Sequence, residues 1–87
     1  MPGVTKLGVV RADREIVAIA FGKALRHCRE QAGISQEELA HSAGVDRTFV
    51  SRAERGVCQP ALATVLLLAR ALKMSASSLV ATMEQNL

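Results

Sequence analysis

The sequence predicts an all-α protein of five helices in a single domain, and three observations support this prediction. Hydrophobic residues make up 49% of the 87 residues, which is enough for a packed core. The chain has only two prolines, Pro2 and Pro60, and its glycines lie mostly where a helical pattern stops. No alternation of apolar and polar residues, which is typical of β-strands, competes with the helical pattern in the body of the chain.

The first helix is expected to start at Glu15. Residues 1–14 show no apolar period and contain Pro2, Gly3 and Gly8, so we expect an N-terminal arm there and the folded domain over residues 15–87. Gly33 stands where a left-handed residue would end this helix. The apolar side chains of its buried face follow helical spacing: Val17, Phe21, Leu25, Cys28 and Ala32.

Two short helices are expected next, each opened by a capping residue. Ser35 and Glu38 form a capping box, and Gly44 closes the helix that they open. Asp46, only eleven residues after Ser35, is a second N-cap, so the chain must turn sharply between the two helices. The helices themselves are expected at residues 36–43 and 47–55.

Two further helices complete the predicted fold, one at about residues 61–73 and one that begins near Ser75. The first is rich in leucine, and Leu66 and Leu67 fall outside its core-facing stripe. That stripe consists of Leu62, Val65, Leu68, Ala69 and Leu72. In the last helix the residues expected to point inward are Leu79, Val80 and Met83.

The spacing of three small or apolar residues indicates a helix-turn-helix unit that starts at Gln36. Ala40 is small because the second helix crosses close to it, Gly44 adopts a positive φ in the turn, and Val50 anchors the second helix in the core. The opposite face of the second helix then carries Arg, Thr and Ser side chains. A helix that packs on the core with one face and exposes Arg, Thr and Ser on the other is suited to enter the major groove of DNA.

The stretch GISQEELAHSAGVDRTFVSRAERG resembles the helix-turn-helix of the phage Cro and repressor (XRE-like) transcription regulators. The resemblance continues through PALATVLLLARALKMSASSLVATM and reaches back to Phe21, so it covers about 64 of the 87 residues. The segment VDRTFVSRAERG is especially similar to the small controller proteins of restriction–modification systems. The resemblance implies a five-helix lambda-repressor-like domain that binds double-stranded DNA as a homodimer, with recognition helices ~34 Å apart.

The resemblance also implies roles for individual residues. Gln36 matches a position that contacts a DNA phosphate, and Arg55 is placed for the DNA backbone. Arg29 and Glu54 match an ion pair that ties the first helix to the recognition helix, so Arg29 is not expected to contact DNA. Base edges and nearby phosphates would be read by Arg47, Thr48, Ser51 and Arg52.

The composition excludes several other classes of function. Eleven Lys and Arg against eight Asp and Glu give a net charge of +3, which permits an anionic partner. Aromatic residues make up only 2%, so a base-stacking surface for single-stranded nucleic acid is not expected. No Ser-His-Asp grouping or Gly-rich phosphate loop is present, which argues against an enzyme.

We expect no metal ion and no cofactor, because Cys28 and Cys58 form no CxxC pair and no Cys/His set at metal spacing. Both thiols are expected to be reduced, and a redox role for either stays open. No apolar run approaches the ~20 residues of a membrane span and no signal peptide is recognisable, so a cytoplasmic location without membrane contact is expected.

The predicted function is therefore that of a sequence-specific, self-regulating transcriptional regulator on a pseudo-palindromic operator, with RNA polymerase or another protein chain as a further partner. Leu66 and Leu67, with Val80 and Met83 of the last helix, are candidates for the dimer interface. Two alternatives stay open. The segment Val4–Ile19 would cover the two leucines, or the chain would be an antitoxin-like protein-interaction module in which the helix-turn-helix serves mainly as scaffold.

Overall fold

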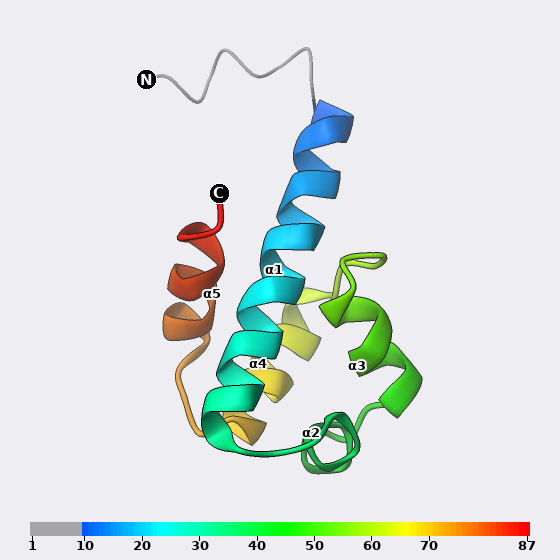
Figure 1. The fold of residues 1–87 in the computed structure, drawn as a ribbon, viewed down its shortest axis with the longest axis vertical. Coiled ribbons are helices and arrows are strands. Elements are labelled where there is room, and N and C mark those ends of the chain that lie inside the picture. The colour runs from blue at the N-terminus through cyan, green and yellow to red at the C-terminus, as the bar shows by residue number, and fades with distance from the viewer. Residues whose placement is uncertain (1–9) are drawn as a thin grey trace.

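The computed structural model describes residues 10–87, and within that range the chain forms five α-helices and no strand (Figure 1). The predicted all-α fold class is confirmed. The helices are α1 (Val10–Ala32), α2 (Gln36–Ala43), α3 (Arg47–Glu54), α4 (Leu62–Ala71) and α5 (Ala76–Glu84).

The longest helix, α1, forms the spine of the molecule. It contacts α3 on one side and α5 on the other, and its first turns extend beyond both of them (Figure 1). Helix α2 packs against α3 and α4, and α4 in turn contacts α5. The recognition-helix candidate α3 is therefore supported by α1 and α2 together.

The core is apolar and draws on all five helices. Each helix contributes one large side chain that is fully buried, and burial of such a side chain stabilises the fold by about 1.5–3 kcal/mol. Among the residues that the structure describes, every residue that is buried as a whole, backbone and side chain together, is apolar or glycine. The five fully buried side chains are Leu25, Leu39, Val50, Leu68 and Leu79.

The predicted N-caps of α2 and α3 are present. The Oγ of Ser35 accepts a hydrogen bond from the Glu38 backbone N–H at 3.0 Å, and Glu38 Oε1 accepts one from the Ser35 N–H at 2.8 Å. Asp46 Oδ1 accepts the Thr48 N–H at 2.9 Å. These bonds satisfy backbone donors that have no partner inside the helix, and they fix where each helix begins.

Four of the five helices end on a residue with positive φ. Three of these residues are glycines, as the sequence predicts, and at Gly44 the Val45 N–H returns to the Ala40 carbonyl at 3.0 Å. Helix α4 ends in the same way at Lys73, with φ of 58°, although a side chain there is strained. The glycines in question are Gly33, Gly44 and Gly56.

The predicted start of the first helix at Glu15 is wrong, because α1 begins at Val10 and so includes residues 10–14. Asp13 lies in its first turn, where a negative charge favours the helix dipole. The remainder of the predicted arm, residues 1–9, lies outside the described residues. A helix that projects beyond its neighbours needs no apolar stripe, so periodicity fails to reveal it.

Two residues that were predicted to face the core are exposed instead. Leu62 is 76% exposed because it is the first residue of α4, which begins at the edge of the domain. Ala32 is exposed because it is the last residue of α1, directly before Gly33 ends the helix. The other members of both predicted stripes are buried or half-buried.

Within residues 10–87, no single helix combines the length and apolar character needed to cross a membrane. Only the pair α4 and α5 reaches the required length and composition together, and these two helices are bent by 103° relative to each other.

Candidate nucleic-acid interface

Helices α2 and α3 form a compact two-helix unit joined by only three residues. Ala40 and Val50 are 3% and 0% exposed, so the two predicted interior positions are confirmed. Gly44 has a φ of 73°, which allows the sharp turn between the helices. The caps at Ser35 and Asp46 hold the two ends of this unit in register.

Helix α3 has two distinct faces. Val50 and Ala53 are completely buried, and half-buried Phe49 packs beside them against the core. On the other side of the helix, the side chain of Ser51 is half-buried. Four further side chains on this side are exposed: Arg47, Thr48, Arg52 and Arg55. Three guanidinium groups thus lie on the solvent side of one eight-residue helix and its C-cap.

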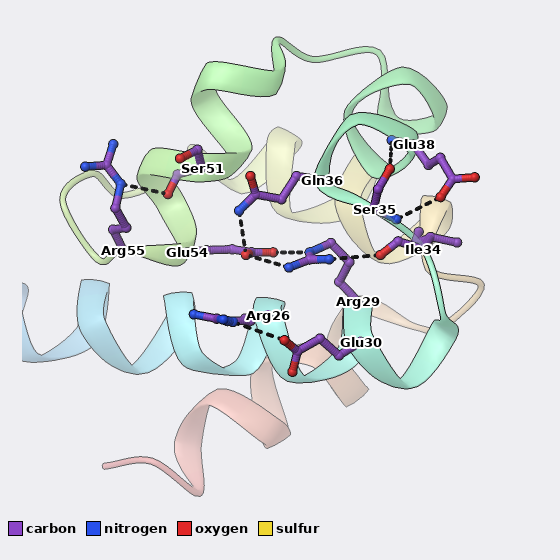
Figure 2. Close-up of polar contacts among 10 residues, drawn as sticks. All are labelled: Arg26, Arg29, Glu30, Ile34, Ser35, Gln36, Glu38, Ser51, Glu54 and Arg55. Atoms are coloured by element: carbon purple, nitrogen blue, oxygen red, sulfur yellow. Dashed lines mark hydrogen bonds and ion pairs between the residues drawn. The ribbon is translucent and has the colours of Figure 1, made fainter.

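The exposed face of α3 is only lightly constrained by contacts within the protein. The Arg55 Nε donates a long hydrogen bond of 3.4 Å to the Ser51 carbonyl (Figure 2). Beside it, Thr48, Arg52 and half-buried Cys58 line a shallow hollow, so the loop after α3 borders this face. Side chains held this loosely are free to rearrange on a ligand.

A buried ion pair fastens α3 to α1. The Arg29 Nε lies 2.6 Å from Glu54 Oε2 and its Nη2 lies 3.1 Å from Oε1, while only 13% and 3% of the two side chains are exposed. The Arg29 Nη1 also donates to the Ile34 carbonyl at 2.9 Å (Figure 2). The structure thus brings together the two residues that the family resemblance pairs, and the guanidinium of Arg29 is turned inward.

The hydrogen bond with Glu54 raises the pKa of Arg29 above its ordinary value, although partial desolvation opposes this shift. Because the pKa of Arg29 is higher in the folded protein than in the unfolded chain, its charge contributes fully to stability at any pH below the ordinary pKa. This contribution is lost only when the pH rises through the raised pKa. The guanidinium of Arg29 therefore stays protonated throughout the pH range in which proteins are studied.

Sequence reasoning missed the position of Gln36 relative to this pair. Its Nε2 donates to Glu54 Oε1 at 2.9 Å, so the side chain predicted to contact a phosphate is joined to the end of the recognition helix (Figure 2). Residues 36 and 54 are eighteen apart in sequence and meet only because the turn folds α2 beside α3. The only indication of this contact in the sequence is that residues 36 and 54 are both polar.

Gly22 is a second residue that the sequence analysis missed. It is buried in the middle of α1, where a Cβ would lie 2.7 Å from the Glu54 carbonyl oxygen and closer still to that of Ala53. The backbones of α1 and α3 therefore approach each other more closely than any other residue would allow. This contact sets the position of α3 on the spine of the molecule.

The four residues proposed for a dimer interface are not equivalent. Leu66 and Leu67 are 48% and 41% exposed, whereas Val80 and Met83 are half-buried against the core. For its described part, the alternative that the segment up to Ile19 covers the leucines is wrong. Residues 10–19 continue α1, and Ile19 is itself 47% exposed.

The remaining candidate chemistry is dispersed. Cys28 and Cys58 are free, half-buried thiols that pack against the core. Across residues 10–87, no three His, Cys, Asp or Glu side chains gather in a group that could hold a metal ion.

Five helices around an apolar core, with an exposed basic helix held across a capped turn, define a DNA-binding protein of the helix-turn-helix class. The chain belongs to the family described as "Helix-turn-helix domain", whose model matches residues 20–81. The family is one of transcriptional regulators.

The relatives of the chain agree with this assignment. A hypothetical transcription factor of Neisseria meningitidis is 40% identical over 75 residues, which cover 86% of this chain and 71% of that protein. An uncharacterized HTH-type transcriptional regulator of Mycobacterium tuberculosis is 36% identical over 58 residues, or 67% of this chain. The match spans only 41% of the mycobacterial protein, so the chain corresponds to about two fifths of it.

Solved structures show the same fold. The restriction–modification controller protein C.AhdI of Aeromonas hydrophila superposes with a TM-score of 0.70 at 40% identity, over 71% of this chain and 94% of that one. The clp gene regulator ClgR of Corynebacterium glutamicum superposes with a TM-score of 0.77 at 26% identity, over 80% and 90% of the two chains. The similarity to controller proteins that the sequence indicates is thereby confirmed.

Proposed function

We propose that this chain is a homodimeric regulator that binds a pseudo-palindromic operator in double-stranded DNA, with α3 in the major groove. The two-faced character of α3 carries this proposal: Val50 and Ala53 are fully buried, while its arginines are exposed. The major groove is about 12 Å wide and admits a helix presented in this way. A cytoplasmic location is part of this proposal.

Each polar residue of the interface has a proposed role. Arg47 and Arg52 have the planar donor geometry that pairs with O6 and N7 of guanine, so we expect a G in each half-site. Thr48 and Ser51 contact adjacent base edges or phosphates. Gln36 and Arg55 bind the phosphate backbone and set the register of the protein on the duplex.

The proposed regulation is by occupancy of a promoter, including that of the gene for this chain. The similarity to proteins named as restriction–modification controllers supports self-regulation. A dimer bound over a promoter blocks it, and one bound just upstream is placed to contact RNA polymerase. In this proposal, the concentration of the protein sets the response.

Gel-shift binding to the DNA upstream of the chain's own gene tests this function. We expect specific affinity at least ~10³ above that for an unrelated fragment and a steep loss with added salt. The Arg47→Ala, Arg52→Ala variant should lose about 2–6 kcal/mol of specific binding, since a good bidentate contact to a base contributes about 1–3 kcal/mol.

The matched control is Lys23→Ala, Arg70→Ala, which removes the same charge at exposed positions outside α2 and α3. It should keep the preference for the specific fragment. Equal, weak binding of the wild type to both fragments, unchanged in the arginine variant, would contradict the proposal. In that case the protein-interaction module would become the better account.

The homodimer is proposed to form through the exposed side of α4. Leu66 and Leu67 are adjacent, large and about half exposed, and apolar neighbours of this kind mark interfaces. We expect the Leu66→Glu, Leu67→Glu variant to sediment as a monomer while retaining its helical circular dichroism, because neither side chain belongs to the core. An unchanged dimer with normal helicity would rule out this interface.

A further inference from the structure

The carboxylate of Glu54 does more than pair with Arg29. Its Oε2 accepts from Arg29 Nε, and its Oε1 accepts from both Arg29 Nη2 and Gln36 Nε2. Arg29 alone provides the charge that a buried carboxylate needs. The bond to Gln36 is therefore not needed to balance the charge of Glu54. Its effect is to constrain the side chain of the first residue of α2.

This constraint fixes the amide orientation of Gln36. A carboxylate accepts hydrogen bonds and cannot donate them, so the amide must turn Nε2 toward Glu54 and Oε1 away from it. Figure 2 shows the amide nitrogen directed at the carboxylate. Nε2 carries two hydrogens, and among the described residues only one of them is used.

We propose that Glu54 is a positioning residue for DNA binding: it holds the Gln36 amide so that its second N–H is presented to a DNA phosphate. The proposal rests on the proposed function, in which Gln36 is a phosphate contact. Glu54 itself is 3% exposed and does not touch DNA. It acts through Gln36 from the last residue of the recognition helix.

Two physical effects make this arrangement favourable for binding. A free glutamine side chain loses considerable conformational entropy when it is immobilised on a ligand. Because Glu54 already holds the Gln36 side chain in one conformation, this entropy is not lost when DNA binds. The positive charge of Arg29 balances the carboxylate, so an approaching phosphate meets a neutral pair and an oriented donor. The same bond also keeps the start of α2 and the end of α3 at a constant separation.

A double-mutant cycle tests the proposal. The probe is a duplex that the wild-type chain selects from random-sequence DNA, and the variants are Gln36→Ala, Glu54→Leu and the two combined. Leucine has a similar size and removes the acceptor for the Gln36 Nε2–H. We expect each single variant to raise Kd about tenfold, as for loss of one hydrogen bond to a charged group. The combined variant should also be about tenfold weaker, because Glu54 acts through Gln36.

Phosphate-ethylation interference provides a readout that a purely structural role would not move. Both single variants should lose interference at the same one phosphate per half-site and keep it elsewhere. The control Glu84→Gln makes the same change in charge at an exposed site on α5 and should bind like the wild type. If Glu54→Leu fails to fold, Glu54→Asp takes its place in the cycle, since it keeps the charge but shortens the reach to Gln36.

The outcomes separate the two hypotheses. Losses that multiply to about a hundredfold in the combined variant, or a Glu54→Leu variant that binds like the wild type, would overturn the positioning role alone. Failure of the wild type to enrich any sequence would instead contradict the proposed function, and the positioning role with it.

Discussion

Replacing Gly22 by alanine is expected to destabilise the protein by about 3 kcal/mol, although alanine is the better helix former by about 1 kcal/mol. The added Cβ would lie 2.7 Å from the Glu54 carbonyl oxygen and nearer to that of Ala53. Both atoms belong to the backbone of α3, so no side-chain rotation relieves the overlap. The two helices must separate, and the Arg29–Glu54 pair must lengthen with them.

Urea unfolding followed by circular dichroism measures this effect. Gly33→Ala is the informative control, because Gly33 has a φ of 73° but open space around its Cβ position. It should lose only about 1–2 kcal/mol, the strain of a left-handed residue. A Gly22→Ala variant at least as stable as the wild type would show that α1 and α3 tolerate a wider separation.

Replacing Arg29 by methionine is expected to cost about 3–5 kcal/mol, the usual loss when one partner of a buried ion pair is removed. The Glu54 carboxyl would lose its cationic partner in a site where its side chain is only 3% exposed, with Gln36 as the remaining donor. The carbonyl of Ile34 would also lose its bond to Nη1.

The double variant Arg29→Met, Glu54→Leu should recover more than half of the stability lost by Arg29→Met, because no buried charge is left without a partner. The comparison is made by chemical denaturation of the two variants and the wild type. A double variant no more stable than the single one would mean that Arg29 acts mainly by packing. The exposed pair between Arg26 and Glu30, at 3.1 Å, is the matched reference, and Arg26→Met should cost less than about 1 kcal/mol.

Local signals in the sequence were sufficient for most of the fold. Capping bonds and left-handed caps involve residues within five positions of each other, so Ser35, Gly44 and Asp46 reveal the ends of α2 and α3 directly. The burial of Val50 follows from helical periodicity. The pairing of Arg29 with Glu54 is implied by family resemblance, since two residues 25 positions apart give no local cue.

The features that escaped prediction depend on contacts between distant segments. In the sequence alone, Gly22 is only a residue of low helix propensity. Its role becomes clear when the backbone of α3 is seen to lie against it. The bond between Gln36 and Glu54 exists only after the turn has closed. The first turns of α1 were missed for the opposite reason, because a projecting helix leaves no apolar period in the sequence.

The separation of α3 into a buried and an exposed face has a consequence for how such a protein diversifies. Val50 and Ala53 hold the helix in place, whereas the arginines and hydroxyls opposite them contribute little to the core. Substitutions on the exposed face therefore leave the folding free energy nearly unchanged. New sequence preferences can accumulate on this scaffold one surface residue at a time, without an intermediate that fails to fold.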